Sequence, residues 1–187
     1  AVRTLLEAGA DATATAPDGA TALHWASYWD DLRAAELLAN AGADVNAAND
    51  LGATPLWNAS LNGSVQMVRS LLDAGGDANA ALLSGESPVM TAARTGNAQV
   101  VRLLLAAGAN PNATAARGQT ALMWATAEGH VDVMRALIAT GADVHGPSTI
   151  GFTPLLFAAS RGDIEAATTL IAAGADVNAP GSDGTHA

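Results

Sequence analysis

The side chains able to do chemistry are scattered along this sequence rather than gathered into a recognisable site. No two of the four histidines are spaced at i and i+4, which would place both imidazoles on one helix face for a metal. Ser60 and Ser160 lie outside any Gly-x-Ser-x-Gly turn, so neither resembles an exposed nucleophile. Because the chain has no cysteine, thiolate zinc sites, disulfides and cysteine nucleophiles are excluded.

The carboxylates and glycines recur with a fixed period instead of forming acid–base pairs or phosphate-binding loops. Five aspartates share one position of that period: Asp11, Asp44, Asp77, Asp143 and Asp176. The glycines lack the strand-then-helix context that a phosphate cradle requires. We therefore predict no catalytic residue, no metal site, no cofactor and no enzymatic activity.

The charge balance restricts the class of partner. All eight basic residues are arginine, and eighteen acidic residues leave a formal net charge of −10. Nucleic acids and anionic membrane surfaces would be repelled, whereas a basic or neutral protein partner would be favoured. No run of 18 apolar residues occurs, so we predict no membrane-spanning segment.

A repeat of 33 residues runs through the whole chain. It is set by two glycine series, which are Gly9, Gly42, Gly75, Gly108, Gly141 and Gly174, and Gly19, Gly52, Gly85, Gly118, Gly151 and Gly184. No insertion or deletion breaks either series. Such a period indicates a solenoid in which each unit packs against its neighbours.

Each unit reads as two helices and a turn. Thr54-Pro55 is typical of an N-cap followed by proline at the first helical position, and Asn62-Gly63 is typical of a helix end. A second helix is predicted from Val65 to Ala74, because its apolar residues fall on one face. Turn residues without helical periodicity follow it.

Several segments in this one register resemble the ankyrin-repeat family. They are Asp18-Gly19-Ala20-Thr21-Ala22-Leu23-His24, Gly129-His130-Val131-Asp132-Val133-Met134-Arg135-Ala136-Leu137-Ile138, Gly151-Phe152-Thr153-Pro154-Leu155 and Gly174-Ala175-Asp176-Val177-Asn178-Ala179. The resemblance covers the whole chain. It implies an all-α solenoid of stacked helix–turn–helix units with projecting β-hairpin-like turns.

The period also predicts the domain organisation. Residues 1–14 are expected to hold the second helix and turn of a partial repeat, and 180–187 to begin a truncated one. Five full repeats lie between them, at 15–47, 48–80, 81–113, 114–146 and 147–179. Neither end shows a dedicated polar cap, so self-association through the ends is one expectation, and a longer parent chain is another.

The resemblance implies that binding positions lie on the turn tips and at the ends of the first helices, facing the concave side. Candidate partner-binding residues there are Tyr28, Trp29, Leu51, Leu61, Leu83, Arg94, Ile150, Phe152 and Arg161. Aromatic and arginine side chains are frequent anchors of protein interfaces, and the two arginines would suit a partner carboxylate. Alternatively, the apolar members fold against neighbouring tips and cover the stack.

Other unusual residues have a structural interpretation. Trp25, Trp57 and Trp124 are expected to pack between adjacent repeats, although an indole edge could alternatively reach the groove. By resemblance, His24 and His130 hold positions where the family uses histidine to hydrogen-bond neighbouring backbone. His145, which replaces a recurrent asparagine, is expected to be a turn residue.

The segment Tyr28–Asp31 departs most from its siblings. Other repeats have glycine between their helices, as at Gly63 and Gly96, whereas this repeat has Asp30. A left-handed aspartate is less favourable than glycine there, unless the turn changes shape. We expect either a local recognition spot or simply an altered turn.

The predicted function is a non-catalytic protein–protein interaction scaffold that binds its partner through the concave groove and turn tips. Two alternatives remain open: an appendage or structural spacer of a larger protein, enzymatic or not, and a self-associating array. The 46 alanines and the arginine-only basic residues indicate a GC-rich, bacterial genome.

Overall fold

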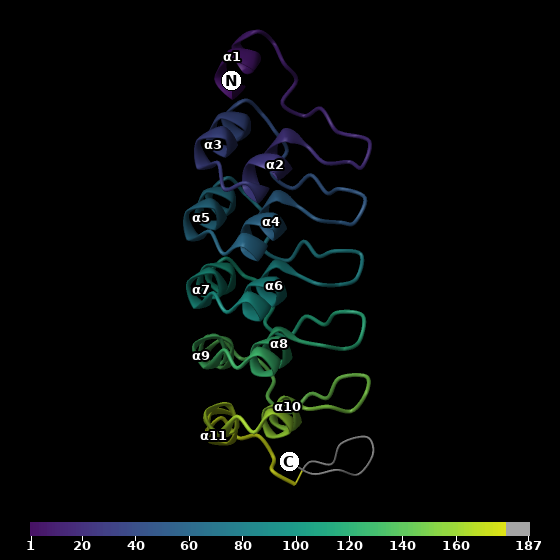
Figure 1. Ribbon diagram of the computed structural model, residues 1–187, viewed down its shortest axis with the longest axis vertical. Helices are drawn as coiled ribbons and strands as arrows, with labels where there is room; N and C mark the ends of the chain where they lie inside the picture. Colours follow the sequence, from purple (N-terminus) through teal and green to yellow (C-terminus); the bar gives the residue numbers. More distant parts are fainter. Residues whose placement is uncertain (179–187) are drawn as a thin grey trace.

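The molecule is a stack of helix pairs with turns projecting to one side (Figure 1). The computed structural model describes residues 1–178, so the predicted truncated repeat at 180–187 lies outside the described residues. Within them are eleven helices: α1 (Val2–Glu7), α2 (Ala22–Tyr28), α3 (Leu32–Asn40), α4 (Pro55–Asn62), α5 (Val65–Asp73), α6 (Pro88–Thr95), α7 (Ala98–Ala106), α8 (Ala121–Glu128), α9 (Val131–Ala139), α10 (Pro154–Arg161) and α11 (Ile164–Ala172). No helix of residues 1–178 has the length and apolar character needed to cross a bilayer.

The helix boundaries follow from capping residues, as α4 illustrates. The Thr54 hydroxyl accepts a hydrogen bond from the backbone N–H of Trp57 at 3.2 Å, and Pro55 takes the first helical position. Gly63 ends the helix with a left-handed φ of 71°. The predicted pair of helices in this unit is thus confirmed, with the second ending at Asp73.

The helices form two layers, which Figure 1 shows as two columns. The first helix of each unit (α2, α4, α6, α8, α10) lies beside the projecting turns, and the second helices form the outer column. Alanines at equivalent positions of the first helices are fully buried, namely Ala59, Ala92, Ala125 and Ala158. These small side chains let successive units approach closely, while a row of leucines fills the space between the layers: Leu38, Leu71, Leu104, Leu137 and Leu170.

An asparagine ladder links the turns that follow the second helices. Asn46 donates through Nδ2 to the Gly75 carbonyl at 3.0 Å and accepts through Oδ1 from the Asp77 N–H at 2.7 Å. Asn79 and Asn112 repeat both bonds one and two units later. His145 lies in the equivalent turn, where its backbone N–H donates to the Asp143 carboxylate at 2.8 Å.

The projecting turns are joined tip to tip by backbone hydrogen bonds. Asp50 donates to the Asp18 carbonyl at 2.9 Å, and Leu83 donates to the Leu51 carbonyl at 3.0 Å. In residues 1–178 these turns contain no extended strand, only an isolated bridge between Thr15 and Thr21. The turns therefore form a continuous rim beside the first helices. We call this rim together with the first helices the inner face.

Candidate functional site

Three aromatic side chains of α2 are exposed together on the inner face. Trp25, Tyr28 and Trp29 keep 51%, 45% and 72% of their surface accessible. Their spacing of i, i+3 and i+4 places them on one side of the helix. Large rings exposed as a group are unusual on a soluble protein surface and mark contact sites.

The rings brace one another in a fixed arrangement. The centroids of Trp25 and Tyr28 are 6.2 Å apart with planes at 82°, and those of Tyr28 and Trp29 are 5.0 Å apart with planes at 84°. Both are edge-to-face contacts, the geometry that the ring quadrupoles favour. Ring faces therefore remain available to a ligand without further ordering of the side chains.

The rings form one wall of a cavity of about 390 Å³. We call this cavity the aromatic pocket, and it is lined by Asp18, Ala20, His24, Trp25, Tyr28, Trp29, Asn49 and Asn58. Residues from two successive turns supply the opposite wall, and α4 contributes Asn58. The pocket thus lies at the boundary between two neighbouring units.

Hydrogen bonds between these units hold the pocket in shape. His24 is buried, and its Nε2 lies 2.8 Å from the Ala53 carbonyl oxygen while Nδ1 faces Thr21. Asn58 donates to the His24 carbonyl at 3.3 Å. Asn62 donates to the Ser27 carbonyl at 3.2 Å and also to that of Tyr28. The end of α2 is therefore fixed against α4.

Asp30 occupies the turn position at which the other units have glycine. Its φ of 56° makes it the one residue other than glycine with left-handed backbone among residues 1–178. The turn has kept the shape that glycine gives elsewhere, so the expectation of an altered turn is wrong. Asp31 then caps α3 by accepting from the Ala34 N–H at 2.9 Å.

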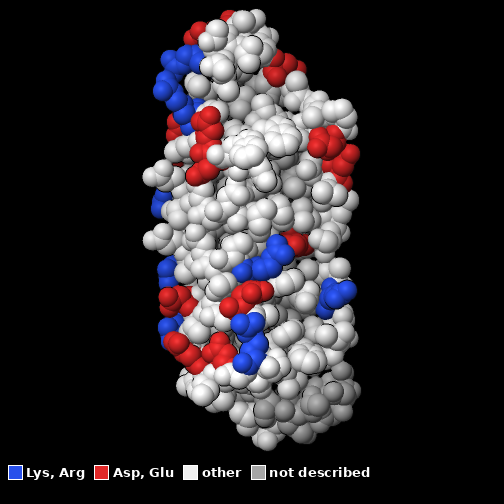
Figure 2. Space-filling view, viewed as in Figure 1, with Lys and Arg blue, Asp and Glu red and all other residues white. Residues whose placement is uncertain are grey.

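The surroundings of the pocket are acidic. Its lining includes the Asp18 carboxylate and no arginine. Figure 2 shows an uncharged surface over α2 and α4 with acidic residues on both sides of it, whereas basic and acidic residues alternate over the later rows. A positively charged ligand would therefore meet little repulsion at the pocket.

The other predicted contact residues are dispersed along the inner face. Leu51, Leu83 and Ile150 are exposed at three of the tips, and Arg161 is exposed at the end of α10. Leu61 is half-buried at the end of α4. Phe152 is also half-buried, because its ring packs against Phe157 with centroids 5.3 Å apart. Among these candidates, Tyr28 and Trp29 are in ring contact, and Leu51 and Leu83 are joined through their backbones.

Arg94 already has partners within the chain. Its Nη2 lies 3.0 Å from Oε1 of Glu86, and its Cζ lies 5.4 Å from the centroid of the Trp124 ring. Glu86 also accepts a hydrogen bond from the Thr91 hydroxyl at 2.9 Å. The guanidinium is thus held between a carboxylate and an aromatic face.

Trp25 corrects the sequence-based expectation. Trp57 and Trp124 are half-buried with their indole nitrogens enclosed, which fits packing between units. Trp25 instead lies half in solvent and lines the pocket, so for this residue the alternative, an indole that reaches the inner face, describes the structure. The spacing of Trp25 from Tyr28 and Trp29 is the sequence signal that indicates their shared face. His24 and His130 do bond neighbouring backbone, His130 through Nε2 to the Arg94 carbonyl at 3.1 Å.

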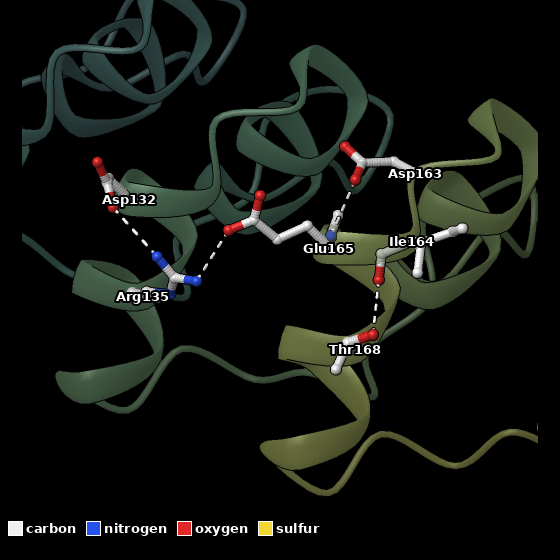
Figure 3. A network of polar contacts seen from close by, with 7 residues as sticks. Asp132, Arg135, Asp163, Ile164, Glu165 and Thr168 are labelled. Carbon is white, nitrogen blue, oxygen red and sulfur yellow. Dashed lines mark hydrogen bonds and ion pairs between the residues drawn. The ribbon is translucent and has the colours of Figure 1, made fainter.

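A second cavity, of about 330 Å³, lies beside α9 but has a different character. Arg135 lines it and pairs with Asp132 at 3.3 Å and with Glu165 at 3.0 Å (Figure 3). Asp163 faces the N-terminus of α11, where it accepts from the Ala166 N–H. The charges around this cavity are already paired, and no group of three or more metal-ligating side chains occurs in the described part of the chain.

Comparison with known families agrees with the repeat geometry. The family described as ankyrin repeats in three copies matches residues 42–115 and 89–180, and the single ankyrin repeat matches residues 18–50. The chain belongs to the ankyrin-repeat family. Ankyrin repeats are generally protein–protein interaction modules, and proteins built from them are typically non-catalytic scaffolds. A search among curated proteins gave no match to this ankyrin-repeat chain.

Proposed function

We propose that this ankyrin array is a non-catalytic scaffold that binds a basic or neutral protein partner through its inner face. The observation that carries the proposal is the exposed group of Trp25, Tyr28 and Trp29 beside a cavity of about 390 Å³. Rigid aromatic side chains with little conformational entropy to lose are the usual anchors of protein interfaces.

The dispersed residues extend the surface from this anchor. Leu51 and Leu83 lie at tips joined by a backbone hydrogen bond, so the rim offers two neighbouring exposed leucines. Arg161 is an exposed cation at the end of α10 and suits a partner carboxylate. A partner lying along the inner face would contact several units at once.

Site-specific photocrosslinking tests the proposal. We would place p-benzoylphenylalanine at position 29 in one variant and at position 66 in another, because Gln66 is exposed on the outer helix α5. A defined protein crosslinked from position 29 in cells of the source organism, and not from position 66, is the expected result. Its binding to the purified array, measured by calorimetry, should weaken when Trp29 is replaced by alanine.

Each alternative gives a different outcome. Equal or absent crosslinking from both positions would contradict the proposal and leave a spacer or appendage role. Crosslinks between two copies of the array would indicate self-association instead. The charge of the partner surface, read from the crosslinked protein, tests the basic-or-neutral part of the proposal.

A further inference from the structure

We propose that the aromatic pocket binds the guanidinium group of an arginine side chain presented by the partner. This inference rests on the proposed function and names the chemistry that the inner face recognises. It is carried by a comparison between two equivalent boundaries within the same array.

At the boundary between the α6–α7 and α8–α9 units, the array binds a guanidinium of its own. Arg94 lies over the Trp124 ring at 5.4 Å, and its Nη2 is 3.0 Å from the Glu86 carboxylate. A planar cation gains from an aromatic face and a carboxylate at the same time, and arginine combines both contacts better than lysine does.

The aromatic pocket occupies the equivalent boundary between the α2–α3 and α4–α5 units. Two periods of 33 residues relate Glu86 to Ala20, Arg94 to Tyr28 and Trp124 to Asn58. All three of these N-terminal equivalents line the pocket. This boundary therefore has no internal arginine. The cavity lies where Ala20 and Asn58 are smaller than the glutamate and tryptophan of the other boundary, and where the ring of Tyr28 takes the place of arginine.

The pocket nevertheless supplies the groups that hold a guanidinium. Trp25, Tyr28 and Trp29 offer aromatic rings, and Asp18 is the acidic residue that lines the same cavity. Asp18 receives one backbone hydrogen bond, from Ala20 at 3.1 Å, through only one of its oxygens. Asn58 uses its amide nitrogen to bond the His24 carbonyl, which leaves Oδ1 as an acceptor.

Charge complementarity favours the same ligand. Asp18, Asp30 and Asp50 form no ion pair within residues 1–178, whereas Arg94 and Arg135 pair with acids of the chain. No arginine lines the pocket, so no internal cation competes for it. A lysine ammonium is a compact, strongly hydrated point charge without a planar face, so it stacks on aromatic rings less well than a guanidinium does.

The test uses a short arginine peptide and an uncharged peptide of the same shape, so it does not require the natural partner to be known. An acetylated, amidated pentapeptide with one arginine between glycines is titrated into the isotope-labelled 187-residue chain, and so is the same peptide with citrulline. Citrulline keeps the planar shape and removes the charge. Nuclear magnetic resonance follows the indole N–H signals of Trp25 and Trp29, with those of Trp57 and Trp124 as internal references.

The arginine peptide should shift the Trp25 and Trp29 signals with a Kd of about 10 mM, as expected for one cation–π contact and one exposed ion pair. Citrulline should leave the signals in place. Replacing Tyr28 by leucine should weaken the binding by about two- to fivefold. Asp18→Asn should also weaken it and reduce its salt dependence, because asparagine keeps the bond from Ala20 but loses the charge.

Asp44→Asn is the matched control, because the Asp44 carboxylate accepts the same type of turn bond, from the Asn46 backbone N–H at 2.8 Å, and Asp44 does not line the pocket. This variant removes an identical charge and should bind like the parent chain. If it weakens binding as much as Asp18→Asn, general charge attraction is responsible and the assignment is overturned.

Four further results would overturn the assignment. Equal shifts with citrulline, or none with arginine, would remove the guanidinium from the pocket, even if crosslinking from position 29 still identified a partner. Equal binding of a lysine peptide would show that the pocket recognises a positive charge without any preference for guanidinium. Shifts of the same signals on concentrating the chain without peptide would identify a second copy as the occupant.

Discussion

Two boundaries in this array occupy equivalent positions of the repeat, but only one of the two holds an arginine side chain. Between the α6–α7 and α8–α9 units, Arg94 fills the inner face by lying against Trp124 and Glu86. Between the α2–α3 and α4–α5 units, the equivalent positions line an open pocket walled by aromatic rings. The comparison shows that the 33-residue pattern sets where side chains lie, while residues outside the pattern decide whether a boundary is closed or available.

The turns beside the two boundaries also differ, because one uses glycine and the other aspartate for the same left-handed position. Gly96 and Gly129 connect their helices with φ values of 81° and 76°, a conformation that glycine adopts without penalty. Asp30 adopts φ 56° at the equivalent place, next to Trp29. Strain of this kind is often concentrated at functional sites, and here it lies directly beside the pocket.

The largest effect should come from the interior, which both regions share. Leu38 and Leu137 occupy equivalent positions in α3 and α9, and both are buried. Replacing either by alanine should lower the free energy of unfolding by about 2–5 kcal/mol, because each change leaves a cavity in a packed interior. Urea denaturation followed by circular dichroism measures the loss. A negligible effect at Leu38 alone would show that the N-terminal unit is not part of the same cooperative stack.

The next effect concerns the glycine turn beside the closed boundary, compared with an equivalent glycine turn in a later unit. A Cβ added at Gly96 would lie 2.7–2.8 Å from the ring of His130, which bonds the Arg94 carbonyl. Gly96→Ala should therefore lower the free energy of unfolding by about 2 kcal/mol, combining left-handed strain with a weakened hydrogen bond. Thermal and urea unfolding measure it. The control is Gly162→Ala, where the same left-handed conformation has no atom within 4 Å of the added Cβ and only the strain applies.

Much of the fold was predictable because the repeat is unbroken. Thr54-Pro55 and Asn62-Gly63 define α4 through local capping, which depends on neighbours in sequence. The pocket depends on relations between units, which no local pattern encodes. Tryptophan is a residue type that is often buried in a core, yet Trp25 is half exposed and lines the pocket. Likewise, the pairing of Arg94 with Glu86 and Trp124 requires a view across two units.

A smaller effect separates arginines that close a boundary from those on the outer surface. Arg94→Met keeps most of the side-chain volume but removes the ion pair and the contact of the charge with Trp124. It should lower the free energy of unfolding by about 1 kcal/mol. Arg135→Met removes two pairs between exposed side chains and should cost less than about 0.5 kcal/mol. Urea unfolding at low and high salt compares them, and an equal loss from both would contradict the special role of the closed boundary.

A change of opposite sign is expected at the open boundary. Asp30→Gly should raise the free energy of unfolding by about 0.5–1 kcal/mol, because glycine removes the left-handed strain. The same variant should leave the arginine-peptide titration of the Trp25 and Trp29 indoles nearly unchanged, since Asp30 does not line the pocket. A destabilised Asp30→Gly protein would show that the aspartate side chain stabilises this turn.

The smallest effect on stability should come from Trp29, which we propose as a binding anchor. Trp29 is 72% exposed, so replacing it by alanine removes little buried surface and should change the free energy of unfolding by less than about 0.5 kcal/mol. Its edge-to-face contact with Tyr28 is the part of the stability at risk. Binding of the crosslinked partner, measured by calorimetry, should nevertheless fall, because the largest accessible ring of the pocket is gone. If Trp29→Ala instead unfolds as readily as Leu38→Ala, the ring belongs to the packing of the array, and the open boundary would have to be regarded as closed by its own aromatic side chains.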